Sequence, residues 1–136
     1  MHSRRIIALI AAAALMLCAC DKVKVDEEFL GNNNLCLIDN GRVIHEYDPL
    51  TWQVAFNKEK REFRVFTDTM SDYYVVSCGQ LPSQIGQEIS ADIKWSGNSI
   101  MTRNNLTFRV EKMDAQGRIW LWSKKNKIAV SVMSLN

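Results

Sequence analysis

The side chains best suited to acid–base or metal chemistry are few in this 136-residue chain, and their spacing matches no catalytic pattern. His45 stands beside Glu46 and Asp48, but a zinc site draws several His or Cys ligands at defined spacing, and neither HExxH nor CxxC occurs. The sequence also contains no nucleophile elbow, phosphate-binding loop or dinucleotide fingerprint. We therefore predict no enzyme, no metal and no cofactor, and we interpret His45 as an ordinary strand residue.

Two aspartates offer the other arrangement of potential ligands. Asp68 and Asp72 lie among hydroxyl side chains, and oxygen atoms are the ligands that calcium prefers. The glycine and the terminal glutamate of the twelve-residue calcium loop are absent, however. We interpret residues 67–72 as a polar turn between strands.

Tryptophan is the residue type that hints at binding. The chain has four: Trp52, Trp95, Trp120 and Trp122. Trp120 and Trp122 would share one face of a strand, with Ile119 and Leu121 on the other. Such a pair would stack on sugar rings or anchor a protein partner if exposed, which requires one of the two rings to be substantially accessible. Alternatively, both rings fill the interior or are covered by residues 68–86.

The N-terminus combines a charged start, an apolar run and a cysteine. Arg4 and Arg5 precede an uncharged run over residues 6–17, and Leu17-Cys18-Ala19-Cys20 follows. This pattern resembles the lipobox signal peptide of bacterial lipoproteins, with features similar to the Bacteroidota type. The resemblance implies diacylation of Cys20 and cleavage just before it. It divides the chain into a signal peptide (1–19), an acylated cysteine with a tether (20–33) and a single β domain (34–136).

The implied acyl chains define the expected partner and location. The apolar run is shorter than the roughly 20 residues that a membrane span needs, whereas two acyl chains hold a protein stably at a bilayer. The expected partner is therefore membrane lipid at Cys20, in the bacterial cell envelope. Asp21 resembles an inner-membrane retention signal, but acidic residues 26–28 resemble surface-export signals, which favours the outer membrane.

The charge of the mature chain argues against nucleic acid as a partner. Of 17 Lys and Arg residues, Arg4 and Arg5 leave with the signal, so that 15 basic residues face 15 acidic ones. A neutral domain without a long basic block has no electrostatic footprint for nucleic acid.

Two cysteines remain once Cys18 is removed and Cys20 is acylated. Cys36 and Cys78 would form one disulfide in an oxidising compartment, closing a loop that stabilises the fold by about 4 kcal/mol in the chain-entropy model. The alternative is a pair of buried free thiols that behave as small apolar residues.

The periodicity of the domain is that of strands almost throughout. Residues 89–96 alternate apolar and polar side chains, as do residues 106–111, and short turns separate the segments up to residue 133. Because short connections require antiparallel pairing, residues 87–133 predict a four-stranded meander. Upstream we expect hairpins at 35–44 and 52–67 and a strand at 73–78. The fold class is all-β, a small antiparallel barrel or sandwich of about eight strands.

Two functions are consistent with these features. The first is a lipid-anchored, non-enzymatic binding or accessory module for an envelope protein or glycan. The second is an inhibitor or immunity-type lipoprotein that blocks an envelope-directed hydrolase, with residues 58–62 or 79–86 as the inserting element.

Overall fold

The computed structural model of the chain describes residues 28–47, 53–66, 73–96 and 101–134. The chain divides into two compact units, residues 1–31 and 32–136. In the first unit, residues 28–31 form a single helical turn. Nowhere in the described ranges is there a helix of the length and apolarity that crossing a bilayer demands. The predicted signal peptide and Cys20 lie outside the described residues.

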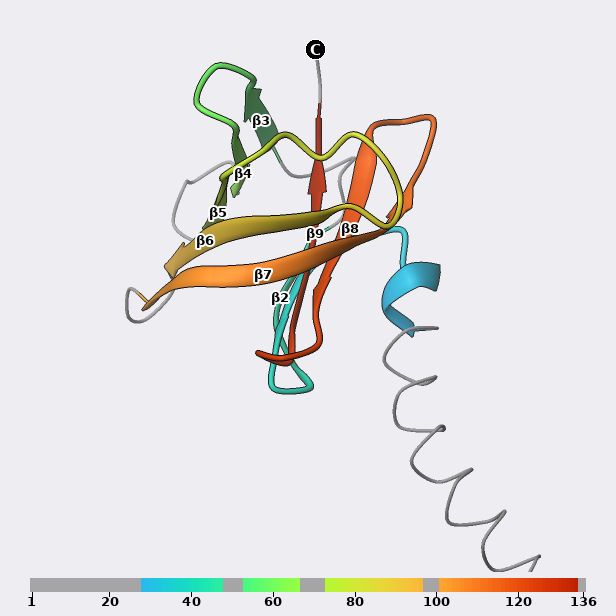
Figure 1. Cartoon of the computed structure of the whole chain (residues 1–136). Coiled ribbons are helices and arrows are strands. Elements are labelled where there is room, and N and C mark those ends of the chain that lie inside the picture. The colour runs from blue at the N-terminus through green and yellow to red at the C-terminus, as the bar shows by residue number, and fades with distance from the viewer. Residues whose placement is uncertain (1–27, 48–52, 67–72, 97–100, 135–136) are drawn as a thin grey trace, which may run out of the picture. The chain divides into compact units, whose positions relative to one another are not determined.

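Strands make up the described part of the second unit, which is a single antiparallel sheet in the order β2-β1-β9-β8-β7-β6-β5-β4-β3 (Figure 1). The nine strands are β1 (Leu35–Asp39), β2 (Arg42–Tyr47), β3 (Gln53–Asn57), β4 (Glu62–Phe66), β5 (Tyr73–Cys78), β6 (Glu88–Ser96), β7 (Met101–Met113), β8 (Arg118–Ser123) and β9 (Ile128–Met133). The predicted all-β class is confirmed. The meander over β6 to β9 and both upstream hairpins also pair as expected.

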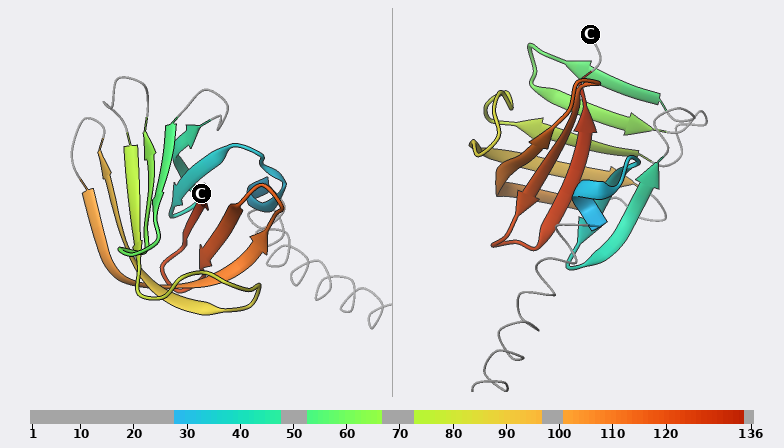
Figure 2. Two further views of the ribbon diagram at one scale, coloured as in Figure 1. Left: turned by 90° about the horizontal axis from the view of Figure 1, so that it is seen from above. Right: turned by 90° about the vertical axis from the view of Figure 1, so that its right-hand side faces the viewer.

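The long strand β7 gives the sheet its curl. Its pairing with β6 shifts register between Ala91 and Ile93, and its pairing with β8 shifts between Val110 and Lys112. Such bulges bend a strand and increase its twist. Figure 2 shows β7 running from the wall formed by β3 to β6 towards the wall formed by β8, β9, β1 and β2. The sheet is therefore one curled layer, a half-barrel, and not the two packed sheets of a sandwich.

Alternating side chains fill the inside of the curl. On β6 the apolar residues predicted to share a face are all buried, and the polar residues between them are exposed. β7 repeats this pattern over its second half. The core cluster also receives side chains from β1, β4, β5, β8 and β9. β6 and the second half of β7 therefore have one face on the core and one on the outside, whereas β9 is buried on both faces.

Residues with positive φ lie in the turns of four hairpins, and two of these turns depend on glycine. Asn40 and Gly41, with φ of 53° and 77°, form the turn between β1 and β2 that their sequence predicts. Gly117, with φ of 89°, turns the chain from β7 into β8. An added Cβ at Gly117 would collide with the carbonyl oxygen of Ser134, so this position requires glycine for space as well as for conformation.

A buried polar bridge connects the two walls. The hydroxyl of Tyr74 on β5 donates a hydrogen bond of 2.6 Å to the carbonyl of Ser131 on β9. The backbone N–H of Cys36 donates to Ser131 Oγ at 2.8 Å, just beyond the last paired residues of β1 and β9. Burial raises the pKa of Tyr74 well above its ordinary value, so this hydroxyl stays protonated and continues to donate.

Of the two alternatives for Cys36 and Cys78, the structure has the pair of buried free thiols and not the disulfide. Cys78 points into the core cluster, whereas Cys36 alternates to the opposite face of its sheet, where its sulfur accepts a bond of 3.8 Å from Ser131 Oγ. In the sheet order β1 and β5 are separated by β9, β8, β7 and β6. Burial raises the pKa of Cys36 to about 11 and that of Cys78 to about 12, as expected of inert thiols.

Candidate functional site

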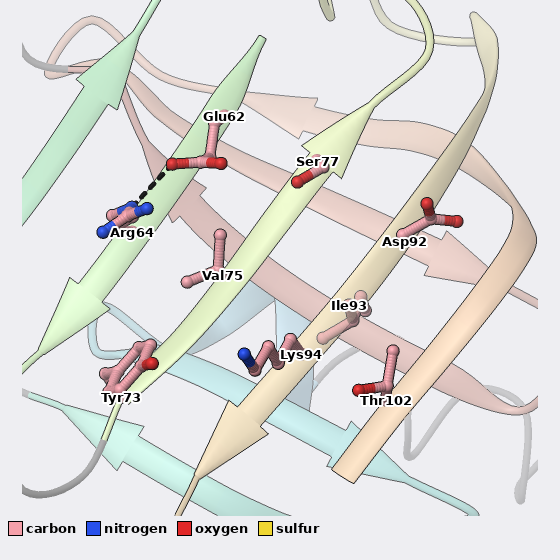
Figure 3. Close-up of a pocket in the computed structure, with 9 residues that line it drawn as sticks. All are labelled: Glu62, Arg64, Tyr73, Val75, Ser77, Asp92, Ile93, Lys94 and Thr102. Carbon is pink, nitrogen blue, oxygen red and sulfur yellow. Dashed lines mark hydrogen bonds and ion pairs between the residues drawn. The ribbon is translucent and has the colours of Figure 1, made fainter. Parts of the chain in front are cut away.

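An open depression of about 250 Å³ lies on the outer face of the wall made by β4, β5, β6 and the start of β7 (Figure 3). Most of the side chains around it project outward from alternate positions of these strands. Its lining residues are Glu62, Arg64, Tyr73, Val75, Ser77, Asp92, Ile93, Lys94 and Thr102. Both signs of charge are represented, and the arrangement of the charges follows from the register of the strands.

One line of side chains across three strands is acidic. Ser77 on β5 pairs with Glu62 on one side and with Asp92 on the other. Neighbouring strands lie about 4.8 Å apart, so the backbone positions of the two acidic residues flank that of the serine at similar distances. We call these three residues the acidic row.

A second line, two residues further along β5, is basic. Val75 pairs with Arg64 on β4 and with Lys94 on β6. Val75 itself is 9% exposed and provides a small apolar floor between the two cations. We call these three residues the basic row. Tyr73 lies beyond it on β5, at the rim of the depression (Figure 3).

Part of this charge is already paired within the protein. Arg64 Nε donates to Glu62 Oε1 at 2.6 Å, with side chains 51% and 21% exposed. Asp92 accepts a bond of 2.8 Å from the backbone N–H of Asn105 through one of its two carboxylate oxygens. Lys94 takes part in no ion pair among the described residues. The β6 side of the depression therefore presents a cation and a carboxylate oxygen for an incoming group.

The described tryptophans, Trp95, Trp120 and Trp122, lie outside the depression, and Trp120 and Trp122 do not form an exposed pair. Trp120 is 1% exposed, with Lys112 Nζ located 4.5 Å from the centre of its ring. Trp122 is partly exposed and shares the face of Trp120. Trp95 is buried in the core, and Trp52 lies outside the described residues. Only Trp122 retains accessible surface for the predicted platform.

The remaining predicted ligands form no site in the described structure. His45 lies in β2, opposite Leu37 of β1. Asp68 and Asp72 lie outside the described residues. Among the residues that the structure describes, no three His, Cys, Asp or Glu side chains are grouped as a metal site would require.

A second, more apolar hollow of about 180 Å³ opens between the β3–β4 hairpin and the segment that follows β5. It is lined by Phe56, Lys58, Phe63, Leu81, Pro82, Met113, Ile119 and Ser134. The rings of Phe56 and Phe63 stack at 4.6 Å between centroids. Ile85, in the same segment as Leu81, is 61% exposed.

Sequence reasoning missed the residues of the depression. Alternation on β6 identifies Asp92 and Lys94 as outward-facing polar residues. It does not show which residues of β4 and β5 stand beside them, because the register depends on the turns between the strands.

No protein family, curated protein or solved structure matches this chain.

Proposed function

We propose that this chain is a lipid-anchored binding or accessory module of the bacterial cell envelope, which holds a protein or glycan partner and catalyses no reaction. Diacylated Cys20 is its attachment to the membrane, with the outer membrane favoured over the inner one. The observation that carries the binding role is the depression on the outer wall, where an acidic row and a basic row lie side by side.

The depression suits binding better than it suits catalysis. Its charged side chains lie on an open sheet face, in contact with water, where the reacting groups of an enzyme would gain little electrostatic stabilisation. A binding partner, in contrast, can cover this face and remove the water as it docks. The polar side chains would then fix the orientation of the partner.

The test is crosslinking in cells that express the full-length chain. A photoreactive amino acid at Ser77, between the two carboxylates, samples whatever occupies the depression. The matched control places the same group at Lys125, which is exposed in the turn between β8 and β9, two strands that do not line the depression. We expect an adduct from position 77 and not from position 125, and digestion of the adduct with a protease or a muramidase identifies its class. No adduct, or equal adducts from both positions, would refute the proposal.

A second candidate is an inhibitor or immunity-type lipoprotein that blocks a hydrolase. The specific observation in its favour is Ile85, which has 61% of its surface exposed and lies in the segment that also carries Leu81 and Pro82 of the apolar hollow. An apolar side chain on a loop is suited to enter the cleft of an enzyme.

The two candidates differ in what Ile85→Asp should do. For an inhibitor, this substitution abolishes inhibition of the target muramidase or protease, while the crosslink at position 77 is unchanged. Val43→Asp is the matched control, since Val43 is 57% exposed on β2. If wild-type protein inhibits none of the hydrolases tested, the inhibitor role fails.

A further inference from the structure

We propose that the depression binds a zwitterionic group of dipeptide length, with its ammonium over Ser77 and its carboxylate over Val75. The inference rests on the proposed binding function and names the chemical class of the ligand. The two unblocked ends of a short peptide carry this pair of charges. The argument uses the balance, the spacing and the accessibility of the charges around the depression.

The charge balance selects for a dipolar ligand. Glu62 and Asp92 carry two negative charges, and Arg64 and Lys94 carry two positive ones, so the net charge of the depression is zero. A simple anion or cation would be attracted by one row and repelled by the other. A molecule with both charges gains from both rows when its ends are correctly placed.

The spacing of the rows sets the length of the ligand. The two rows are two residues apart along β5, which corresponds to about 6.6 Å of strand. Two residues of an extended peptide span about 7 Å. A dipeptide lying antiparallel to β5 thus brings its amino end over Ser77 and its carboxylate over Val75. Each end of the dipeptide then lies between two side chains whose charge is opposite to its own, one on β4 and one on β6.

The charges can be reached by such a ligand. Lys94 has no ion-pair partner among the described residues, and Asp92 has one carboxylate oxygen outside its bond to Asn105. The ion pair of Arg64 with Glu62 is exposed to water, and pairs of this kind are weak enough to exchange with a ligand. Tyr73 flanks the carboxylate end, where its ring would contact the last side chain of the peptide.

Amide spectra of the ¹⁵N-labelled full-length chain, in micelles of a detergent without a sugar headgroup, test the inference. The probes are alanyl-alanine, its N-acetylated form, its C-amidated form and the disaccharide of N-acetylglucosamine. We expect alanyl-alanine to shift the amides of β4, β5 and β6 in a saturable way. Each blocked form should bind about tenfold more weakly or worse, a difference of about 1.4 kcal/mol, because it lacks one charge-assisted pair.

Two neutralising substitutions locate the ends of the ligand. Lys94→Gln should weaken binding of alanyl-alanine about tenfold and remove the effect of C-amidation. Asp92→Asn keeps the oxygen that accepts from Asn105. This variant should also bind alanyl-alanine about tenfold more weakly, and N-acetylation of the dipeptide should then have no further effect. Glu88→Gln is the matched control, since Glu88 is exposed on the same face of β6 but outside the depression, and its affinity should be that of the wild type.

The outcomes separate this inference from the function on which it rests. If the blocked dipeptides bind as well as alanyl-alanine, or if only the disaccharide shifts the depression, the zwitterionic ligand is wrong. In that case a crosslink from position 77 still supports a binding module. If no probe shifts these amides and position 77 gives no adduct, both proposals fail.

Discussion

Replacing Tyr74 by phenylalanine removes the buried hydrogen bond between the two walls of the half-barrel and keeps the aromatic ring. The side chain is fully buried, and its hydroxyl lies 2.6 Å from the carbonyl oxygen of Ser131. Phenylalanine keeps the ring and its stacking on Tyr47, which has a centroid distance of 5.7 Å. The variant therefore isolates the hydroxyl group.

The expected cost follows from the carbonyl that is left behind. Ser131 lies entirely in the interior, so water does not replace the lost donor. A buried acceptor that loses its partner costs about 1–3 kcal/mol, which exceeds the net value of an ordinary exposed bond. For a domain of this size, each kcal/mol lowers the melting temperature by about 4–8 °C.

Urea unfolding monitored by tryptophan fluorescence measures this cost. Tyr73→Phe is the matched control, because Tyr73 is the adjacent residue but faces outward and is partly exposed, so its loss should stay within about 0.5 kcal/mol. The slope of the unfolding free energy with urea should be the same for both variants, since the fold is unchanged. If Tyr74→Phe and Tyr73→Phe unfold at the same urea concentration, the bridge does not stabilise the half-barrel.

Three further predictions concern the thiols and one turn. Cys36 and Cys78 should react with a thiol reagent only after unfolding, and reduction should leave the mass unchanged. Stability should fall by about 1 kcal/mol for each thiol between pH 8 and 10. The folded pKa values are about 11 and 12, so in this range the thiols lose their protons in the unfolded chain but keep them in the folded one. The stability of Cys36→Ala, measured by urea unfolding, should fall less than that of the wild type between pH 8 and 10. Gly117→Asn should lower stability by about 1–2 kcal/mol more than Gly41→Asn in thermal melts, because of these two glycines Gly117 is crowded by Ser134 and Gly41 has open space around it. Equal melting temperatures of the two variants would contradict this.

The inner face of the sheet could be predicted because its signal is local. On β6, Ile93 and Trp95 alternate with Lys94 and Ser96, and this period alone identifies which side chains meet the core. The hairpin at Asn40-Gly41 is likewise local, because it depends on positive φ at two adjacent residues.

The outer face could not be predicted, because it depends on neighbours that are distant in sequence. The place of Glu62 beside Ser77 requires the register of β4 on β5, which the alternation within either strand leaves open. The same reason explains why both alternatives for Cys36 remained open. An even number of cysteines suggests a bond, but the face on which the Cys36 sulfur lies is set by the pairing of β1 with β9. The burial of Trp120 also depends on what covers its strand, and not on the strand itself.

The pairing of β1 with β9 has a consequence for how the protein is made. β1 pairs with β2, the next strand along the chain, but its other partner is β9, so the sheet cannot be completed until residue 133 has been synthesised. Contacts of such long sequence separation form slowly. A chain exported by the signal that residues 1–19 resemble would thus reach the translocation machinery still unfolded, and its last strand would complete the sheet only after secretion.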